Sequence, residues 1–290
     1  MKCWYKKGKL VVVCDPGIDD LLALRLLERL RPGCNAGIEP VFGNMPKKVT
    51  LRNARAYAAM SDYEWNVLHS EDRRPRPGVW IDKAQGRDGL WNTTEGMKLA
   101  PTASMNNDAP TEDSIISLGT LGPVMRRMQQ SGTGRILIMG GVFERISENG
   151  NDAELNIRLN PGDARWVFDN ADKADIWLVP ADVAFGTAWT RSDVESIPEL
   201  SDVDSWLKQV MLRNYESGRY KDENELYDPI AVLLGFCPQL ATWERIGVRV
   251  DEIGRTLFDE SKPPVWIATD IPDRKQLADI LFTLLFKEKL

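Results

Sequence analysis

Three aspartates lie close together in the segment VCDPGIDD, residues 13–20. Asp15 follows an apolar run, and Asp19 and Asp20 open a stretch with the spacing of an amphipathic helix. Carboxylates at this spacing repel one another, and partial burial strengthens the repulsion. A cation would relieve the repulsion, and clustered oxygen donors suit a hard ion such as Ca²⁺ or Mg²⁺. The segment is therefore a candidate metal site.

The acidic segment is also compatible with roles that differ from metal binding alone. Acidic residues in the first turn of a helix often only complement the helix macrodipole. A phosphate-binding loop is disfavoured because the segment lacks a glycine-rich run and a lysine, and because its charge repels anions. An enzyme that forms an aspartyl phosphate is retained as an alternative interpretation, because a strand-end aspartate with nearby acids and Mg²⁺ also fits phosphoryl transfer.

Short apolar runs alternate with longer helical patterns along the chain. The predicted strands cover residues 10–14, 38–44, 114–119, 135–141, 175–183 and 265–271. The predicted helices cover residues 18–30, 47–60, 123–130, 161–170 and 274–286. Strands joined by helices of this length indicate right-handed βαβ units. The predicted fold is a single α/β domain over residues 1–290, with an open, mostly parallel, doubly wound (Rossmann-like) sheet flanked by helices.

Ligands of such sheets collect at the carboxyl ends of the strands. This rule predicts that one edge of the sheet carries Asp15, Asn44, Leu118 and Met139. Two further regions are expected near that edge: a polar loop region at 69–113, and a mainly helical region over the site at 192–236.

Composition excludes several classes of protein. The 290-residue chain has a net charge of −6, which argues against a nucleic-acid-binding surface. No apolar run reaches the ~18–20 residues of a membrane span, and the apolar N-terminal stretch is too short for a secretory signal. The four cysteines show no CxxC spacing, so a reduced, cytoplasmic compartment is predicted.

Five further segments follow VCDPGIDD in order along the chain. They are VFGNMPKKVTLRNARA (41–56), QGRDGL (85–90), LIMGG (137–141), DAELNIRLNPGDARWVF (152–168) and LYDPIAVLL (226–234). Together the six segments resemble the nucleoside hydrolase family, the inosine-uridine-preferring ribohydrolases, from about Leu10 to the C-terminal helix. The resemblance implies an open α/β fold, a catalytic Ca²⁺ in a ribose pocket, and hydrolysis of a ribonucleoside to free base and ribose.

The resemblance also implies roles for individual residues. Asp15 would be both a Ca²⁺ ligand and the base that acts on the attacking water. The remaining metal ligands would be Asp20, the carbonyl of Leu118, and Asp228. The positions implied to hold the sugar are Asp19, Asn44, Glu154, Asn156 and either Asn149 or Asn151, with Met139 beneath the ring. Negative charge near C1′ and an oriented water suit the oxocarbenium-like transition state of this reaction.

Three positions depart from the family pattern. Val13 replaces an aspartate, which removes a hydrogen bond behind the metal ligands rather than a ligand itself. Gln85, kept as a substrate-binding candidate, and Tyr227 stand where histidines are common. The one histidine of the chain, His69, lies in no motif. We therefore expect no histidine in the site to protonate the leaving base.

Tyr227 has two possible roles in place of a histidine. It resembles the aromatic residue on which purine-preferring members stack the base, with Trp80 or Trp91 as a possible second ring. Alternatively, its phenol donates the proton, although an ordinary tyrosine pKa near 10 makes it a slow acid at neutral pH. Stacking is the preferred interpretation.

The leading prediction is a Ca²⁺-dependent ribonucleoside hydrolase that prefers a purine or modified purine. Its substrate would be a small molecule, with no nucleic-acid or membrane partner, and the resemblance implies a homodimer or homotetramer. One alternative is a nucleoside-binding or regulatory protein of the same fold with weak catalysis. Another is a Mg²⁺ phosphohydrolase, which leaves the sugar-side residues Glu154 and Asn156 unexplained.

Overall fold

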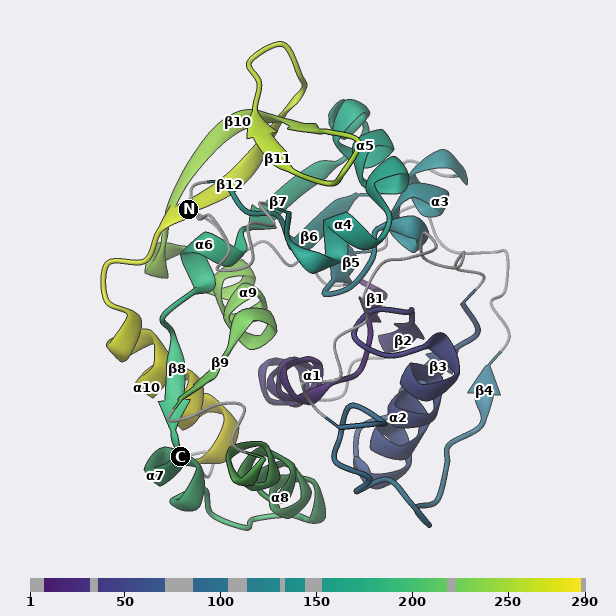
Figure 1. The fold of residues 1–290 in the computed structure, drawn as a ribbon, viewed down its shortest axis with the longest axis vertical. Coiled ribbons are helices and arrows are strands. Elements are labelled where there is room, and N and C mark those ends of the chain that lie inside the picture. The colour runs from purple at the N-terminus through teal and green to yellow at the C-terminus, as the bar shows by residue number, and fades with distance from the viewer. Residues whose placement is uncertain are drawn as a thin grey trace.

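A mostly parallel sheet forms the centre of the computed structural model (Figure 1). The structure describes residues 8–31, 36–70, 86–103, 114–130, 134–143, 153–217 and 223–287. In these ranges ten strands form one sheet, in the order β11-β10-β12-β7-β6-β5-β1-β2-β3-β4. The run from β12 to β4 is parallel, whereas β10 pairs antiparallel with both β12 and β11.

The strands and helices have the following bounds. The strands of this sheet are β1 (Leu10–Cys14), β2 (Ala36–Pro40), β3 (Trp65–Leu68), β4 (Thr102–Ala103), β5 (Ser114–Ser117), β6 (Arg135–Met139), β7 (Asp175–Val179), β10 (Thr242–Val250), β11 (Thr256–Phe258) and β12 (Pro264–Asp270). A separate antiparallel pair joins β8 (Ala188–Thr190) to β9 (Glu223–Glu225). The helices are α1 (Ile18–Leu30), α2 (Lys47–Met60), α3 (Gly122–Gln130), α4 (Leu155–Leu159), α5 (Pro161–Asp169), α6 (Ala181–Ala184), α7 (Arg191–Glu195), α8 (Asp202–Glu216), α9 (Tyr227–Phe236) and α10 (Arg274–Phe286), with short 3₁₀ turns η1 (Ala171–Lys173) and η2 (Pro238–Leu240).

Helices cover both faces of the sheet. Alternate residues of a strand point to opposite faces, so Val12 and Cys14 of β1 pack into the core that includes α1, α8, α9 and α10. Val11 and Val13 pack into a second core with α3 and α5. Figure 1 shows α1 and α9 together on one side and α3 and α5 on the other. The predicted doubly wound α/β fold is confirmed.

The helix predictions were more accurate than the strand predictions. The helices predicted at 18–30, 47–60 and 274–286 have the observed bounds. The strand predicted at 38–44 was displaced, since β2 runs from Ala36 to Pro40 and the chain then turns at residues 43–45.

Three more differences follow from local chemistry. The strands predicted to extend to 141 and 183 stop at Met139 and Val179, where Gly140 and Pro180 lead the chain out of the sheet. The antiparallel strand β10 was not predicted because much of it is exposed and polar, which hides the apolar pattern of a buried strand. The region 192–236 is mainly helical but contains the short strand β9. Among the described helices, none is long and apolar enough to cross a membrane.

Candidate active site

The acidic turn between β1 and α1 is fixed by its own side chains. Asp20, in the first turn of α1, accepts hydrogen bonds from the backbone N–H of Asp15 (3.1 Å) and from that of Gly17 (2.9 Å). The bond from Gly17, the N-cap residue, satisfies a donor that the helix start leaves without an intrahelical partner. Both bonds hold the chain in the turn that brings the carboxylates of Asp15, Asp19 and Asp20 to one edge of the sheet.

Asp15 is buried between the loops that follow β2 and β5, the two strands that flank β1 in the sheet. The backbone N–H of Asn44, after β2, donates to Asp15 Oδ2 at 2.7 Å. A Cβ atom on Gly43 would lie 2.1 Å from the carboxyl carbon of Asp15, and one on Gly119, after β5, would lie 3.3 Å from Oδ1. Both loops can approach the carboxylate this closely because they carry glycine there.

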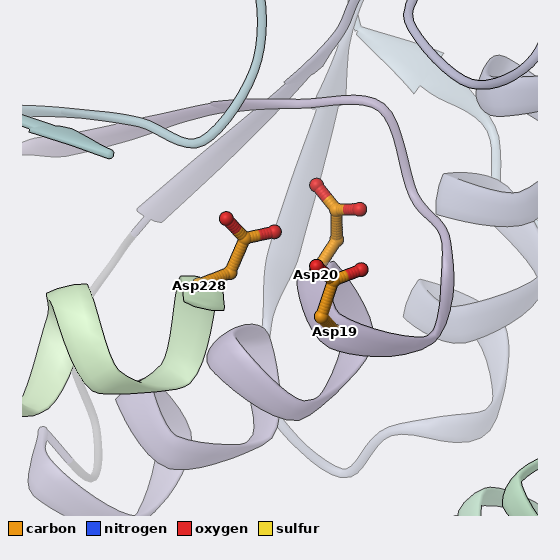
Figure 2. Close-up of side chains that lie close together, drawn as sticks. All are labelled: Asp19, Asp20 and Asp228. Atoms are coloured by element: carbon orange, nitrogen blue, oxygen red, sulfur yellow. The ribbon is translucent and has the colours of Figure 1, made fainter. Parts of the chain in front are cut away.

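The starts of two helices bring three other carboxylates together. Asp19 and Asp20 lie in the first turn of α1, and Asp228 lies in the first turn of α9, which packs beside α1. Each of the three offers an oxygen within 4.8 Å of the others. Figure 2 shows Asp228 facing the two aspartates from the opposite helix. Residues more than 200 positions apart in the sequence therefore share one site.

Burial and mutual repulsion raise the pKa values of these carboxyl groups. Burial, opposed by the Asn44 hydrogen bonds and reinforced by the charges of Asp19 and Glu154, raises the pKa of Asp15 to about 8. Burial, followed by the charges of neighbouring carboxylates, raises the pKa of Asp20 and of Asp228. Oxygen donors crowded in this way fit a hard divalent cation. Asp19, Asp20 and Asp228, together with Asp15, are the residues that would hold it. The structure thus groups Asp19 with the metal candidates, whereas the resemblance assigned it to the sugar.

Two of the residues expected to bind the sugar, Glu154 and Asn156, lie at the carboxyl ends of β5 and β6. Asn156 Nδ2 donates to the carbonyl of Leu118 at 3.1 Å and to that of Met139 at 3.4 Å. Glu154 caps the N-terminus of α4, since its carboxylate accepts from the backbone N–H groups of Asn156 and Ile157. The N–H of Gly141 donates to the same carboxylate at 3.1 Å. The structure thus places Leu118, Met139, Glu154 and Asn156 in direct contact.

The structure describes only some of the residues expected to lie near the nucleobase. The hydroxyl of the half-buried Tyr227 donates to Glu225 Oε2. The indole N–H of Trp91 donates to Asn214 Oδ1 of α8 at 3.3 Å, which ties that turn to the helix. His69 is exposed at the end of β3, and Val13 is buried in the core on the α3 side. Gln85, Trp80, Asn149 and Asn151 lie outside the described residues.

Sequence reasoning missed residues that act through the backbone. Asn53 Nδ2 donates to the carbonyls of Pro16 (2.9 Å) and Asp88 (2.7 Å), so one amide ties the acidic turn to the turn at 86–97. Gly43 and Gly119 make room for Asp15. Asn53 and Gly43 belong to the segment 41–56 that the resemblance singled out, but nothing local in the sequence indicated which carbonyl or carboxylate they would meet.

This site lies on a fold with established relatives. The model of the inosine-uridine preferring nucleoside hydrolases matches residues 10–279. The chain belongs to the nucleoside hydrolase family, and it is thus a hydrolase acting on N-glycosyl compounds. The family assignment predicted from the six segments is confirmed.

The similarity extends over nearly the whole chain. The chain is 24% identical to uridine nucleosidase 1 of Arabidopsis thaliana, over 88% of this chain and 83% of that protein. It is 22% identical to the inosine-uridine preferring nucleoside hydrolase of Crithidia fasciculata, over 85% and 84%. A solved plant nucleoside hydrolase superposes with a TM-score of 0.83 at 25% identity, covering 98% of this chain and 100% of that one. A purine-preferring ribonucleoside hydrolase from Gardnerella vaginalis shares the fold, with a TM-score of 0.79 at 20% identity over 96% and 98%.

The raised carboxyl pKa values predict how stability depends on pH and metal. A carboxyl group with a higher pKa in the folded state binds more protons folded than unfolded, so stability falls as pH rises between the two values. For Asp15 this window runs from its ordinary 3.8 to about 8. The chelated protein should therefore melt at lower temperature at pH 8 than at pH 6. Added Ca²⁺ should raise the melting temperature most at pH 8, because the ion takes the place of bound protons.

The measurement is thermal unfolding from pH 5 to pH 8 with chelator and with Ca²⁺. A Ca²⁺-induced shift that stays constant over this range would contradict the expectation. Mg²⁺ at equal concentration serves as the comparison ion, because it demands tighter octahedral geometry than Ca²⁺.

Proposed function

We propose that the protein hydrolyses the N-glycosidic bond of ribonucleosides in a Ca²⁺-dependent reaction, with a preference for purine or modified purine bases. The observation that carries the proposal is the convergence of Asp19, Asp20 and Asp228 beside the buried Asp15. Membership of the nucleoside hydrolase family supports the reaction class.

Asp15 is the proposed base for the attacking water. The Asn44 N–H fixes Oδ2, so the carboxylate is oriented before substrate arrives. Negative charge from Asp15 and its neighbours stabilises the oxocarbenium-like transition state as the bond to the base breaks. Bound Ca²⁺ would supply the positive charge that lets these carboxylates stay ionised together, and it would coordinate oxygens of the sugar and water.

Glu154 and Asn156 are the proposed sugar-binding residues. Asn156 commits Nδ2 to two carbonyls, which orients its Oδ1 as the acceptor for a ribose hydroxyl. The Glu154 carboxylate has capacity for a further hydroxyl donor beside the backbone N–H groups it already accepts from. A site built for hydroxyl groups should discriminate strongly against deoxyribose, because its polar groups would then be left unpaired.

Tyr227 is the proposed stacking residue for the base. Its hydroxyl proton is directed at Glu225, which favours stacking over proton donation to the leaving base. We expect Tyr227→Phe to keep kcat/KM within about threefold and Tyr227→Ala to lower it about tenfold or more, because one aromatic stack contributes about 0.5–1.5 kcal/mol and ring burial adds to it. Steady-state kinetics on the preferred nucleoside measures both. If Tyr227→Phe loses as much activity as Tyr227→Ala, the phenol is the acid instead.

Uridine hydrolysis is the second candidate. Curated relatives from Arabidopsis thaliana and Saccharomyces cerevisiae are named uridine nucleosidases. A reducing-sugar assay over purine, modified purine, pyrimidine and 2′-deoxy nucleosides, with Ca²⁺ and then with chelator, decides between them. Ca²⁺-dependent ribose release from purine nucleosides supports the proposal, whereas release from uridine alone overturns the purine preference. Nucleoside binding by calorimetry without any release would instead support a weakly catalytic binding protein.

A further inference from the structure

We infer that Thr256 is a positioning residue. It fixes the position of residues 141–143, the segment after β6, and through them the orientation of the Glu154 carboxylate, so it affects sugar binding separately from metal binding. The inference rests on the proposed function, in which Glu154 binds the ribose. Thr256 is buried in β11, a strand in none of the six segments shared with the family.

The Thr256 hydroxyl bonds both backbone groups of one residue. Its Oγ1 accepts from the N–H of Val142 at 2.9 Å and donates to the carbonyl of Val142 at 2.8 Å. The preceding residue, Gly141, has φ +80°, and a Cβ there would lie 3.2 Å from both Oγ1 and Cγ2 of Thr256. The backbone at 141–142 is therefore packed directly on this side chain.

A second residue of β11, Phe258, packs against Phe143, the residue that follows Val142. Residues two apart on a strand share a face, and the ring of Phe258 stacks on that of Phe143, with centroids 4.4 Å apart and an interplanar angle of 7°. From another side, Asp182 accepts a hydrogen bond from the N–H of Phe143 at 2.5 Å. β11 and α6 together fix where the segment after β6 leaves the sheet.

One further hydrogen bond connects residues 141–143 to the candidate site. The N–H of Gly141 donates to Glu154 Oε2 at 3.1 Å. Loss of the Thr256 hydroxyl would leave the N–H and carbonyl of Val142 unpaired in a partly buried place, which favours a shift of the segment. Glu154 would then lose a donor that orients it. The metal-site carboxylates lie directly after β1 and in the first turns of α1 and α9, so their positions should be unaffected.

The test compares two substitutions at one position with a matched control. Thr256→Val has nearly the same shape without the hydroxyl, and Thr256→Ser keeps it. Thr269→Val makes the same chemical change on β12, where the hydroxyl contacts an exposed strand carbonyl at 3.5 Å. Calorimetry measures D-ribose binding in Ca²⁺ and, separately, Ca²⁺ binding, and kinetics on the best nucleoside gives kcat and KM.

We expect Thr256→Val to weaken ribose binding about tenfold, the size of effect that follows from losing the one hydrogen bond by which Gly141 orients the Glu154 carboxylate. KM should rise more than kcat falls, and Ca²⁺ affinity should stay within about twofold. Thr256→Ser and Thr269→Val should behave like the wild type.

Three results would overturn the inference, and they show whether the proposed function fails with it. Equal ribose binding by Thr256→Val and wild type, or a matching loss of Ca²⁺ affinity, would overturn the positioning role and leave the proposed function in place. A wild-type protein that binds no ribose and releases none from any nucleoside would overturn the proposed function, and the inference with it.

Discussion

Asp15→Asn should lower kcat for nucleoside hydrolysis by about 10³-fold, within the range that removal of a general base produces. The substitution keeps the shape of the side chain, and its Oδ1 can still accept the hydrogen bond that the Asn44 N–H now gives to Asp15. It removes the group that would take the proton from water, together with one of the charges that would stabilise the transition state.

The stability of this variant separates lost chemistry from lost folding. Burial raises the pKa of Asp15 to about 8, so ionising this group is unfavourable in the metal-free fold. A neutral amide avoids that cost, and the chelated Asp15→Asn protein should be at least as stable as the chelated wild type at pH 8. Thermal unfolding and single-substrate kinetics on both proteins check this.

The matched control for charge removal is Asp172→Asn. Asp172 is exposed in the turn η1, which leads into the amino end of β7, whereas the site lies at the carboxyl ends of the strands, so its loss of charge should leave kcat unchanged. More than a tenth of wild-type kcat in Asp15→Asn would rule out Asp15 as the base. Asp19 and Asp228, whose charges act on or are acted on by that of Asp15, would then be the next candidates for the base.

Gly43→Ala should reduce kcat by about 10²-fold, the size of loss that follows from misplacing a reacting group by ~1 Å. The added methyl group would lie 2.1 Å from both the carboxyl carbon and Oδ2 of Asp15, a separation no pair of unbonded heavy atoms tolerates. Asp15 or the Gly43–Asn44 backbone must move, and either movement breaks the 2.7 Å hydrogen bond that orients the carboxylate.

Gly134→Ala is the control for adding a methyl group. A Cβ on Gly134 would meet no atom within 4 Å, so the activity of this variant should match that of the wild type. A crystal structure of Gly43→Ala, or the Ca²⁺ affinity of the variant, reports whether Asp15 has moved. Full activity in Gly43→Ala would mean that the loop gives way without disturbing Asp15, and the close packing would then have no catalytic role.

Local patterns in the sequence determined much of this protein. Helical periodicity predicted α1, α2 and α10 with their observed bounds, because amphipathic spacing and end signals are properties of consecutive residues. The acidic segment 13–20 predicted a metal site, and the six ordered segments predicted the family that the comparisons confirmed.

The tertiary structure decided which distant groups meet. The Thr256 hydroxyl lies 114 positions from the Val142 backbone that it bonds, and the Asn44 N–H lies 29 positions from the Asp15 carboxylate. The order of strands in the sheet sets these contacts, and that order depends on pairing between remote segments rather than on the spacing of neighbours. For the same reason, the chain names the candidate carboxylates, whereas the packing of α1 against α9 brings Asp228 to Asp19 and Asp20.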